Sequence, residues 1–196
     1  MMSGEQYTGV KFTTVFRNRI TLQHRLLDDL RMWCQLFDEK GLAPPYPGGS
    51  YGNLSFRTGS NSFIITGTAI GLKDALCNES FVEVTACQTF QNKVMVNGLR
   101  EPSSESMLHY TIYSQRPDVN AVFHGHCTEL MESAATLGIP VTDKEAPYGS
   151  VELAESIGRL VNSDFFILKN HGFVSLGRRM KEAGQQAVNM IERVKK

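Results

Sequence analysis

The sequence lacks the features of a membrane, secreted or nucleic-acid-binding protein. Its 20 basic and 20 acidic residues balance, and the basic ones are scattered instead of gathered in one stripe, which argues against a nucleic-acid or anionic-membrane surface. No run of about 18 apolar residues occurs, and residues 1–11 contain no apolar core of signal-peptide length. We therefore expect a cytoplasmic protein that acts on small molecules, with neither nucleic acid nor membrane as a partner.

Cysteine pairs and nucleotide-binding fingerprints are also missing. The four cysteines (Cys34, Cys77, Cys87 and Cys127) are irregularly spaced and form no Cys-x-x-Cys pair, so free thiols are expected in place of disulfides or a zinc ribbon. Neither a Gly-x-x-x-x-Gly-Lys-Ser/Thr loop nor a Gly-x-Gly-x-x-Gly fingerprint is present.

The hydrophobic pattern predicts one α/β domain over residues 1–196. Apolar residues recur at three- and four-residue steps over residues 16–40, which predicts an amphipathic helix that ends at Gly41. Strands are predicted at residues 53–57, 62–66, 81–85, 93–96, 121–126, 165–169 and 173–176, and further helices at residues 104–114, 128–137, 151–161 and 180–194. This order indicates an αβα layered fold around a central mixed, mainly antiparallel sheet.

A His-x-His triplet carries the clearest chemical signal. His124 and His126 end an apolar run, and because side chains on a strand alternate faces, both imidazoles point the same way and could close on one ion. Such a pair also occurs by chance, so further ligands are needed. His171, in Lys169-Asn170-His171-Gly172 at a strand end, offers a third imidazole, although a histidine in a β-turn is the plain alternative.

Glu105 is the best carboxylate candidate for the same site. Pro102-Ser103-Ser104-Glu105 places it in the first turn of a helix capped by Ser103 or Ser104, although serine followed by glutamate is also ordinary helix-start chemistry. His109 is four residues further on and either ligates the same ion or forms a routine helix pair with Glu105. His24, placed mid-helix among polar neighbours, is expected at the surface or partly packed.

Two short turns could bind an anion. Gly52-Asn53-Leu54-Ser55 and Thr66-Gly67-Thr68 each end or begin a predicted strand, where backbone N–H groups and hydroxyls can act as donors. Such turns are common, and neither predicts a phosphate site by itself.

Five motifs taken in order resemble those of the class II aldolase/adducin family over about residues 20–195. They are Gly52-Asn53-Leu54-Ser55, Ile64-Ile65-Thr66-Gly67-Thr68, Glu101-Pro102-Ser103-Ser104-Glu105, Arg116-Pro117-Asp118-Val119-Asn120-Ala121-Val122-Phe123-His124-Gly125-His126 and Lys169-Asn170-His171-Gly172. Each is weak alone, but their order and separations are specific. The family contains sugar-phosphate aldolases such as L-fuculose-phosphate aldolase, a sugar-phosphate 4-epimerase, methylthioribulose-phosphate dehydratase and metal-free adducin head domains.

The resemblance implies a bound divalent ion, usually zinc, and a phosphorylated substrate. The residues that it assigns to the metal are His124, His126, His171 and Glu105, and those that it assigns to the substrate phosphate are Asn53, Thr68, Ser103 and Ser104. The chain departs from the aldolases at Ala69, where they have glycine, so the backbone has less freedom to approach a phosphate there.

Among the family's activities we expect a zinc-dependent aldolase that cleaves a small phosphorylated ketose. Zinc acts as a Lewis acid that stabilises the enediolate left by the cleavage, and a positioned acid or base must move protons. Retention of all three histidines argues against an adducin-like module. Epimerases of the family carry aspartate where this chain has Glu105, which favours aldol cleavage.

The acid or base stays open between Glu105, Glu145 and Tyr148. The stretch from His126 to Pro147 is shorter than in fuculose-type aldolases, and residues 141–145 match a dehydratase pattern whose glutamate is catalytic, so a dehydratase using Glu145 is the alternative. Tyr148 could protonate a leaving alkoxide. The resemblance also implies a homotetramer with active sites between subunits, in which a neighbour could supply the acid and the C-terminal helix could form an interface.

Overall fold

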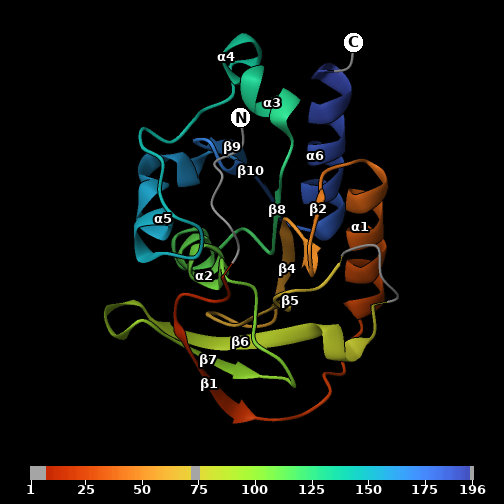
Figure 1. Ribbon diagram of the computed structural model, residues 1–196, viewed down its shortest axis with the longest axis vertical. Coiled ribbons are helices and arrows are strands. Elements are labelled where there is room, and N and C mark those ends of the chain that lie inside the picture. Colours follow the sequence, from red (N-terminus) through yellow and green to blue (C-terminus); the bar gives the residue numbers. More distant parts are fainter. Residues whose placement is uncertain (1–7, 72–75, 195–196) are drawn as a thin grey trace.

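The computed structural model describes residues 8–71 and 76–194, which form an α/β fold around an eight-stranded sheet (Figure 1). The strands are β1 (Thr13–Asn18), β2 (Pro45–Tyr46), β3 (Gly49–Ser50), β4 (Asn53–Arg57), β5 (Phe63–Thr66), β6 (Phe81–Gln88), β7 (Lys93–Asn97), β8 (Ala121–Gly125), β9 (Phe165–Leu168) and β10 (Gly172–Gly177). The α-helices are α1 (Leu27–Glu39), α2 (Ser106–Gln115), α3 (Thr128–Glu132), α4 (Ala134–Leu137), α5 (Val151–Ser156) and α6 (Met180–Val194), and the 3-10 helices are η1 (Asn78–Ser80), η2 (Thr89–Gln91) and η3 (Gly158–Asn162).

The large sheet has the strand order β1-β7-β6-β5-β4-β8-β10-β9. Strands β1 and β7 run parallel, and every other neighbouring pair described in this sheet is antiparallel. Strands β2 and β3 form a separate hairpin. The expected α/β class with a mixed, mainly antiparallel sheet is therefore confirmed, and its extent over residues 1–196 stays a prediction.

Helices cover both faces of the sheet, with α1 and α6 on one face and α2 and α5 on the other (Figure 1). The first core contains Phe37 and Phe123, and the second contains Ile112 and Val122; full burial of each such side chain contributes about 1.5–3 kcal/mol. Val122 and Phe123 are neighbours on β8 and face opposite cores, as strand alternation requires. His124 follows Val122 in this alternation and therefore faces the α2 side.

The predicted helix over residues 16–40 is wrong in its first part. Residues Thr13–Asn18 form β1, and α1 begins only at Leu27. A strand at this position pairs with β7, and this pairing overrides a spacing of apolar residues that was compatible with a helix. His24 consequently lies before α1, where it is half-buried and its ring centroid lies 4.8 Å from that of Phe56.

Three other predicted helices differ in detail. Helix α2 begins at Ser106 with Glu105 as the N-cap and no side-chain capping bond, so neither Ser103 nor Ser104 caps it; the amide of Ser106 donates instead to the carbonyl of Ser103. The predicted helix over residues 128–137 is divided into α3 and α4, and that over 151–161 into α5 and η3. Gly158 lies at the junction of α5 and η3 with φ +42°, a conformation that glycine adopts without steric cost.

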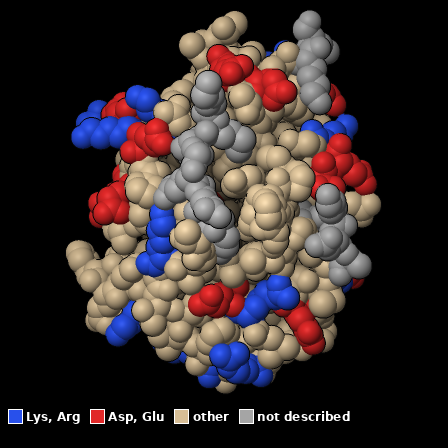
Figure 2. All heavy atoms as spheres, viewed as in Figure 1, with Lys and Arg blue, Asp and Glu red and all other residues tan. Residues whose placement is uncertain are grey.

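Three further properties can be compared with the sequence: the state of the cysteines, the apolarity of the helices and the distribution of surface charge. The four cysteines are free. Within residues 8–71 and 76–194, no helix combines the length and apolarity needed to cross a bilayer. Basic and acidic side chains are interspersed on the face shown in Figure 2, as the balanced charge predicts.

Candidate active site

Strand β8 brings His124 and His126 together on the α2 side of the sheet. Their Nε2 atoms lie 2.9 Å apart, and both side chains are buried. His124 Nδ1 lies 2.7 Å from the carbonyl oxygen of Phe173. Because a carbonyl can only accept, Nδ1 carries the proton, and the neutral ring presents its Nε2 lone pair to the site.

His171 reaches the same point from the turn between β9 and β10. Asn170 adopts a left-handed conformation with φ +57°, and the ring centroid of His171 lies 5.2 Å from that of His124 and 5.0 Å from that of His126. Gly172 permits this approach, because a Cβ there would lie 2.8 Å from His124 Cε1. One ligand nitrogen from each histidine can be chosen so that all lie within 4.8 Å of one another.

The Glu105 carboxylate lies against this cluster. Its Oε1 atom is 2.5 Å from His171 Nε2, and its Oε2 atom is 3.1 Å from His124 Nε2. Asn53 Nδ2 donates to Oε2 at 2.9 Å. Asn53 begins β4 and is paired directly with His124 on β8, so the sheet register fixes the amide that holds the carboxylate.

Burial and mutual charge control protonation in this cluster. Burial lowers the pKa of His124, and burial together with the neighbouring His124 and His171 holds the pKa of His126 well below its usual value. Burial alone would raise the pKa of Glu105, but His124, His171 and the hydrogen bonds from His171 and Asn53 outweigh it and hold that pKa well below the usual range. Near neutral pH the site therefore combines an ionised carboxylate with neutral imidazoles at His124 and His126.

These groups fit a shared cation. With the Nδ1 proton of His124 directed at Phe173, the Nε2 lone pair of His124 faces the Oε2 atom of Glu105 at 3.1 Å, and a cation between the two atoms would be attracted by both. Among the described residues, His126 Nδ1 is buried without a hydrogen-bond partner, so this nitrogen is unsatisfied within the fold. Neutral imidazoles and a carboxylate are ligands of catalytic zinc sites. The histidine cluster could therefore hold a metal ion.

A cleft with about 780 Å³ of empty space, its open mouth included, lies over the cluster, a size within the range of small-molecule sites. All four predicted phosphate-binding residues line it, namely Asn53, Thr68, Ser103 and Ser104. The lining also includes residues to which the sequence assigned no role, namely Tyr46, Ser50, Tyr51, Ile70 and Asn170. Ser50 and Tyr51 directly precede the Gly52-Asn53 turn and could have been inferred from it, whereas nothing in the sequence singled out Tyr46 or Ile70.

The remaining candidate acids and bases lie in different surroundings. Tyr148 lines the cleft and is buried. Glu145 is exposed, and its carboxylate accepts a hydrogen bond from Asn170 Nδ2 at 2.8 Å. Within the described part of the chain, Glu145 is not among the residues that line the cleft.

Ala69 and His109 resolve two further questions from the sequence. Ala69 lines the cleft with φ +52°, a left-handed conformation that costs an L residue about 1–2 kcal/mol.

His109 does not belong to the histidine cluster. Its side chain is buried, and its Nδ1 atom lies 2.7 Å from Ser55 Oγ. Burial lowers the pKa of His109 to about 3. The packing interpretation of His109 therefore fits the geometry better than a ligand role.

Known proteins are similar to this chain in sequence and in fold. The model of the class II aldolase and adducin N-terminal domain matches residues 28–195. The chain belongs to the class II aldolase/adducin family. An L-fuculose phosphate aldolase of Methanococcus maripaludis (strain C7 / ATCC BAA-1331) is 31% identical over 173 residues, which are 81% of this chain and 87% of that protein.

Two further relatives of this class II aldolase/adducin chain are informative. The 5-methylthioribulose-1-phosphate/5-deoxyribulose-1-phosphate aldolase of Rhodospirillum rubrum (strain ATCC 11170) is 29% identical over 193 residues, which are 89% of this chain and 79% of that protein. The solved structure of an L-fuculose 1-phosphate aldolase superposes with a TM-score of 0.71 at 22% identity, covering 89% of this chain and 84% of that one. The latter comparison shows the shared fold.

Proposed function

We propose that this chain is a zinc-dependent aldolase, a carbon–carbon lyase that cleaves a small phosphorylated ketose. The observation that carries the proposal is the convergence of His124, His126 and His171 with both carboxylate oxygens of Glu105 beneath a cleft lined by hydroxyl and amide groups. The names of the relatives, an L-fuculose phosphate aldolase and a 5-methylthioribulose-1-phosphate/5-deoxyribulose-1-phosphate aldolase, support the same substrate class.

The three histidines and Glu105 would hold the divalent ion. When bound, the ion supplies a Lewis acid that stabilises negative charge developing on the substrate oxygens. Glu105, kept ionised by its neighbours, serves as the fourth ligand or as the group that accepts a substrate proton. Asn53 fixes the carboxylate through Oε2, so both of these roles depend on it.

The phosphate-binding assignment rests on the type of donor and on position. Asn53, Thr68, Ser103 and Ser104 come from three separate segments and meet on the cleft wall, where hydroxyl, amide and backbone N–H groups can bind a phosphate. Ser50 lies in the same lining and extends this set.

Proton transfer distinguishes the candidate reactions. Aldol cleavage removes a hydroxyl proton from the ketose as the carbon–carbon bond breaks and later returns a proton to the product, so an acid or base must face the cleft. Tyr148 does so, whereas Glu145 is exposed and bonded to Asn170. The geometry therefore favours aldol cleavage with Tyr148 over dehydration with Glu145.

Assembly and location are further parts of the proposal. We expect a homotetramer with active sites between subunits, in the cytoplasm, without nucleic-acid or membrane partners. The family resemblance supports the assembly, and the free thiols and balanced charge support the location and the absence of such partners. Light scattering on the purified protein tests the tetramer.

Product analysis tests the activity. The zinc-loaded protein is incubated with a panel of ketose 1-phosphates, and the products are separated. An aldehyde plus dihydroxyacetone phosphate is the expected result, with about one zinc ion per chain by elemental analysis. Loss of water from an intact carbon chain would identify the dehydratase, a changed stereocentre the 4-epimerase, and intact metal binding without turnover a non-catalytic adducin-like module.

A further inference from the structure

A segment that precedes the family-matched region reaches the candidate active site. The match begins at residue 28, yet Thr8 and Gly9 contact the hydroxyl of Tyr148, a residue of the cleft wall. The Thr8 amide donates to the phenolic oxygen at 2.8 Å, and Thr8 Oγ1 lies 2.9 Å from the same oxygen. The phenol donates in turn to the carbonyl of Gly9 at 3.3 Å.

A phenol can form all three of these contacts at once. Its oxygen accepts through two lone pairs and donates one proton, so Thr8 can fill both acceptor positions while Gly9 receives the proton. The Gly9 contact is the longest of the three. The hydroxyl can therefore rotate its proton from Gly9 toward a substrate oxygen while Thr8 still holds the phenolic oxygen in place.

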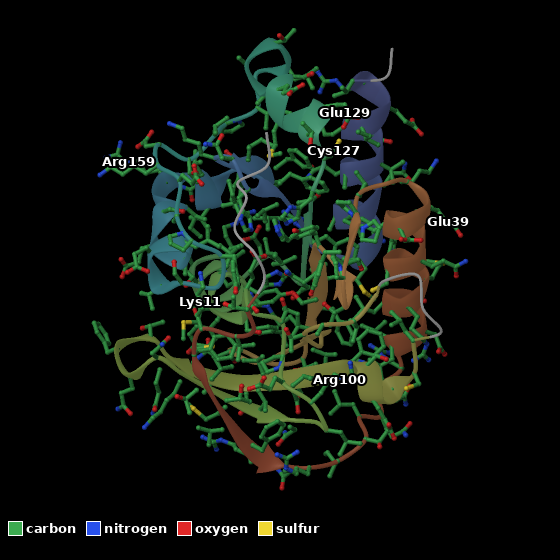
Figure 3. The ribbon with its side chains drawn as sticks, in the orientation of Figure 1. Lys11, Glu39, Arg100, Cys127, Glu129 and Arg159 are labelled. Carbon is green, nitrogen blue, oxygen red and sulfur yellow. The ribbon has the colours of Figure 1, made fainter. Side chains whose placement is uncertain are left out.

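Lys11 fixes the ring of the same tyrosine. Its Nζ atom lies 3.8 Å from the centroid of the Tyr148 ring, an attractive cation–π geometry. Figure 3 shows Lys11 on the α2 side of the molecule. Gly9 adopts φ +103°, which lets the segment turn around the phenol so that residues 8, 9 and 11 all face it.

The other side of Tyr148 adjoins the turn that carries the predicted phosphate ligands. Gly149 has φ +65°, and a Cβ there would lie 2.9 Å from the carbonyl oxygen of Ser104. No larger residue fits between the two backbones. Tyr148 is thus held between the N-terminal segment and the turn that leads into Glu105.

We propose that residues 8–11 are a positioning segment of the active site, in which Thr8 holds the phenolic oxygen of Tyr148 at the cleft so that this phenol can donate its proton to the substrate. The catalytic part of this inference rests on the proposed aldolase function. The positioning part does not, and it is tested separately.

A double-mutant cycle tests the catalytic part, with Thr8→Val, Tyr148→Phe and the double variant assayed for cleavage of the ketose phosphate. Thr8→Val should lower kcat about 5-fold, the effect of losing one hydrogen bond, with little change in KM. Combined with Tyr148→Phe, it should lower kcat no further, since Thr8 acts through the phenol. Equal loss in both backgrounds would overturn the inference, because it would show a merely structural role.

Thr14→Val is the matched control. Thr14 lies just beyond the positioning segment, in β1, and its hydroxyl donates to Glu101 Oε1 at 3.1 Å in an exposed position. It should leave kcat and KM unchanged. A loss equal to that of Thr8→Val would show that any weakening of the N-terminal region suffices, and this would overturn the specific role of Thr8.

Nitration of Tyr148 by tetranitromethane, followed by peptide mass spectrometry, tests positioning without an activity assay. Thr8→Val should raise the nitration rate at Tyr148, and Thr14→Val should not. An unchanged rate in Thr8→Val overturns the inference whatever the kinetics. If the wild-type protein cleaves no ketose phosphate, the proposed function fails, and a raised nitration rate still establishes the positioning segment.

Discussion

Two groups of side chains near Glu105, one of three histidines and one built around His109, differ in what surrounds them. In the metal-site cluster, His124, His126 and His171 turn ring nitrogens toward one another and toward Glu105. In the second group, which we call the α2 cluster, His109 bonds to Ser55 Oγ at 2.7 Å, and the same Oγ lies 2.8 Å from the hydroxyl of Tyr113.

The difference indicates which of the two groups contributes to the stability of the fold. In the α2 cluster the hydroxyls of Ser55 and Tyr113 and the Nδ1 atom of His109 bond to one another, whereas His109 Nε2 is buried without a hydrogen-bond partner among the described residues. The guanidinium of Arg57 lies 4.7 Å from the Tyr113 ring centroid. Removing a bonded member of this cluster leaves its buried partner unpaired. In the metal-site cluster the Nε2 lone pair of His124 faces the Glu105 carboxylate, an arrangement that a bound cation would stabilise. We therefore expect the α2 cluster to stabilise the fold and the metal-site cluster to depend on a ligand.

The largest expected effect is on metal affinity. His124→Ala should weaken zinc binding by more than about 100-fold, because changes to mere outer partners of a ligand already cost 10–100-fold, and activity should be lost with the metal. His109→Gln should change zinc affinity far less. Isothermal titration calorimetry measures both. A similar loss in the two variants would mean that the α2 cluster belongs to the metal site.

Metal removal should separate the clusters by stability. At a free zinc concentration of 100 times Kd, the bound ion should raise the free energy of unfolding by about 2.7 kcal/mol, or Tm by about 5–10 °C for a chain of this size. His126→Ala should abolish most of this zinc-dependent rise in the free energy of unfolding. It should leave the metal-free protein no less stable, because it removes one of the imidazoles whose ring nitrogens face one another. Differential scanning calorimetry with and without chelator measures both effects. A lower Tm for the metal-free His126→Ala variant than for the metal-free wild type would contradict the prediction.

The α2 cluster should leave its own mark on the pH dependence of stability. Burial lowers the pKa of His109 from the ordinary histidine value of 6.5 to about 3, so below pH 6.5 the unfolded chain binds a proton that the folded chain does not. The free energy of unfolding therefore falls as the pH drops from 6.5 toward 3, by up to about 1.4 kcal/mol per pH unit. His109→Gln should flatten this decline in urea titrations of the chelated protein; parallel curves for the two proteins would refute a neutral buried His109.

The sequence located the residues that meet at the candidate site better than it located the beginnings of the helices, and the roles of those residues stay predictions. Strand alternation is a local pattern, and it predicts that His124 and His126 lie on one face of the sheet. The register that sets His124 opposite Asn53 joins distant segments and is indicated only by the order of the family's motifs. Residues 16–18 were misassigned because their strand depends on β7, a partner far along the chain. The contact between Thr8 and Tyr148 spans 140 positions and carries no local pattern at all. Pairings of this kind depend on tertiary packing.

The smallest expected effect is on the free energy of unfolding and concerns Ala69, in the wall of the cleft. Ala69 adopts φ +52° in the cleft wall, where the left-handed conformation costs about 1–2 kcal/mol, and glycine offsets this partly by its greater unfolded-state entropy, about 0.5–1 kcal/mol. Ala69→Gly should therefore raise the free energy of unfolding by about 0.5–1 kcal/mol in urea denaturation.

Asn92→Gly is the control for this substitution. Asn92 has the same φ of +52°, but asparagine tolerates it, and its side chain donates to the carbonyl of Lys11 at 2.7 Å, so no gain is expected there. A tighter KM for the phosphorylated substrate in Ala69→Gly alone would show that the strained residue also limits the approach of backbone to phosphate. Equal gains at both positions would instead mean that the left-handed backbone, and not its place in the cleft, sets the effect.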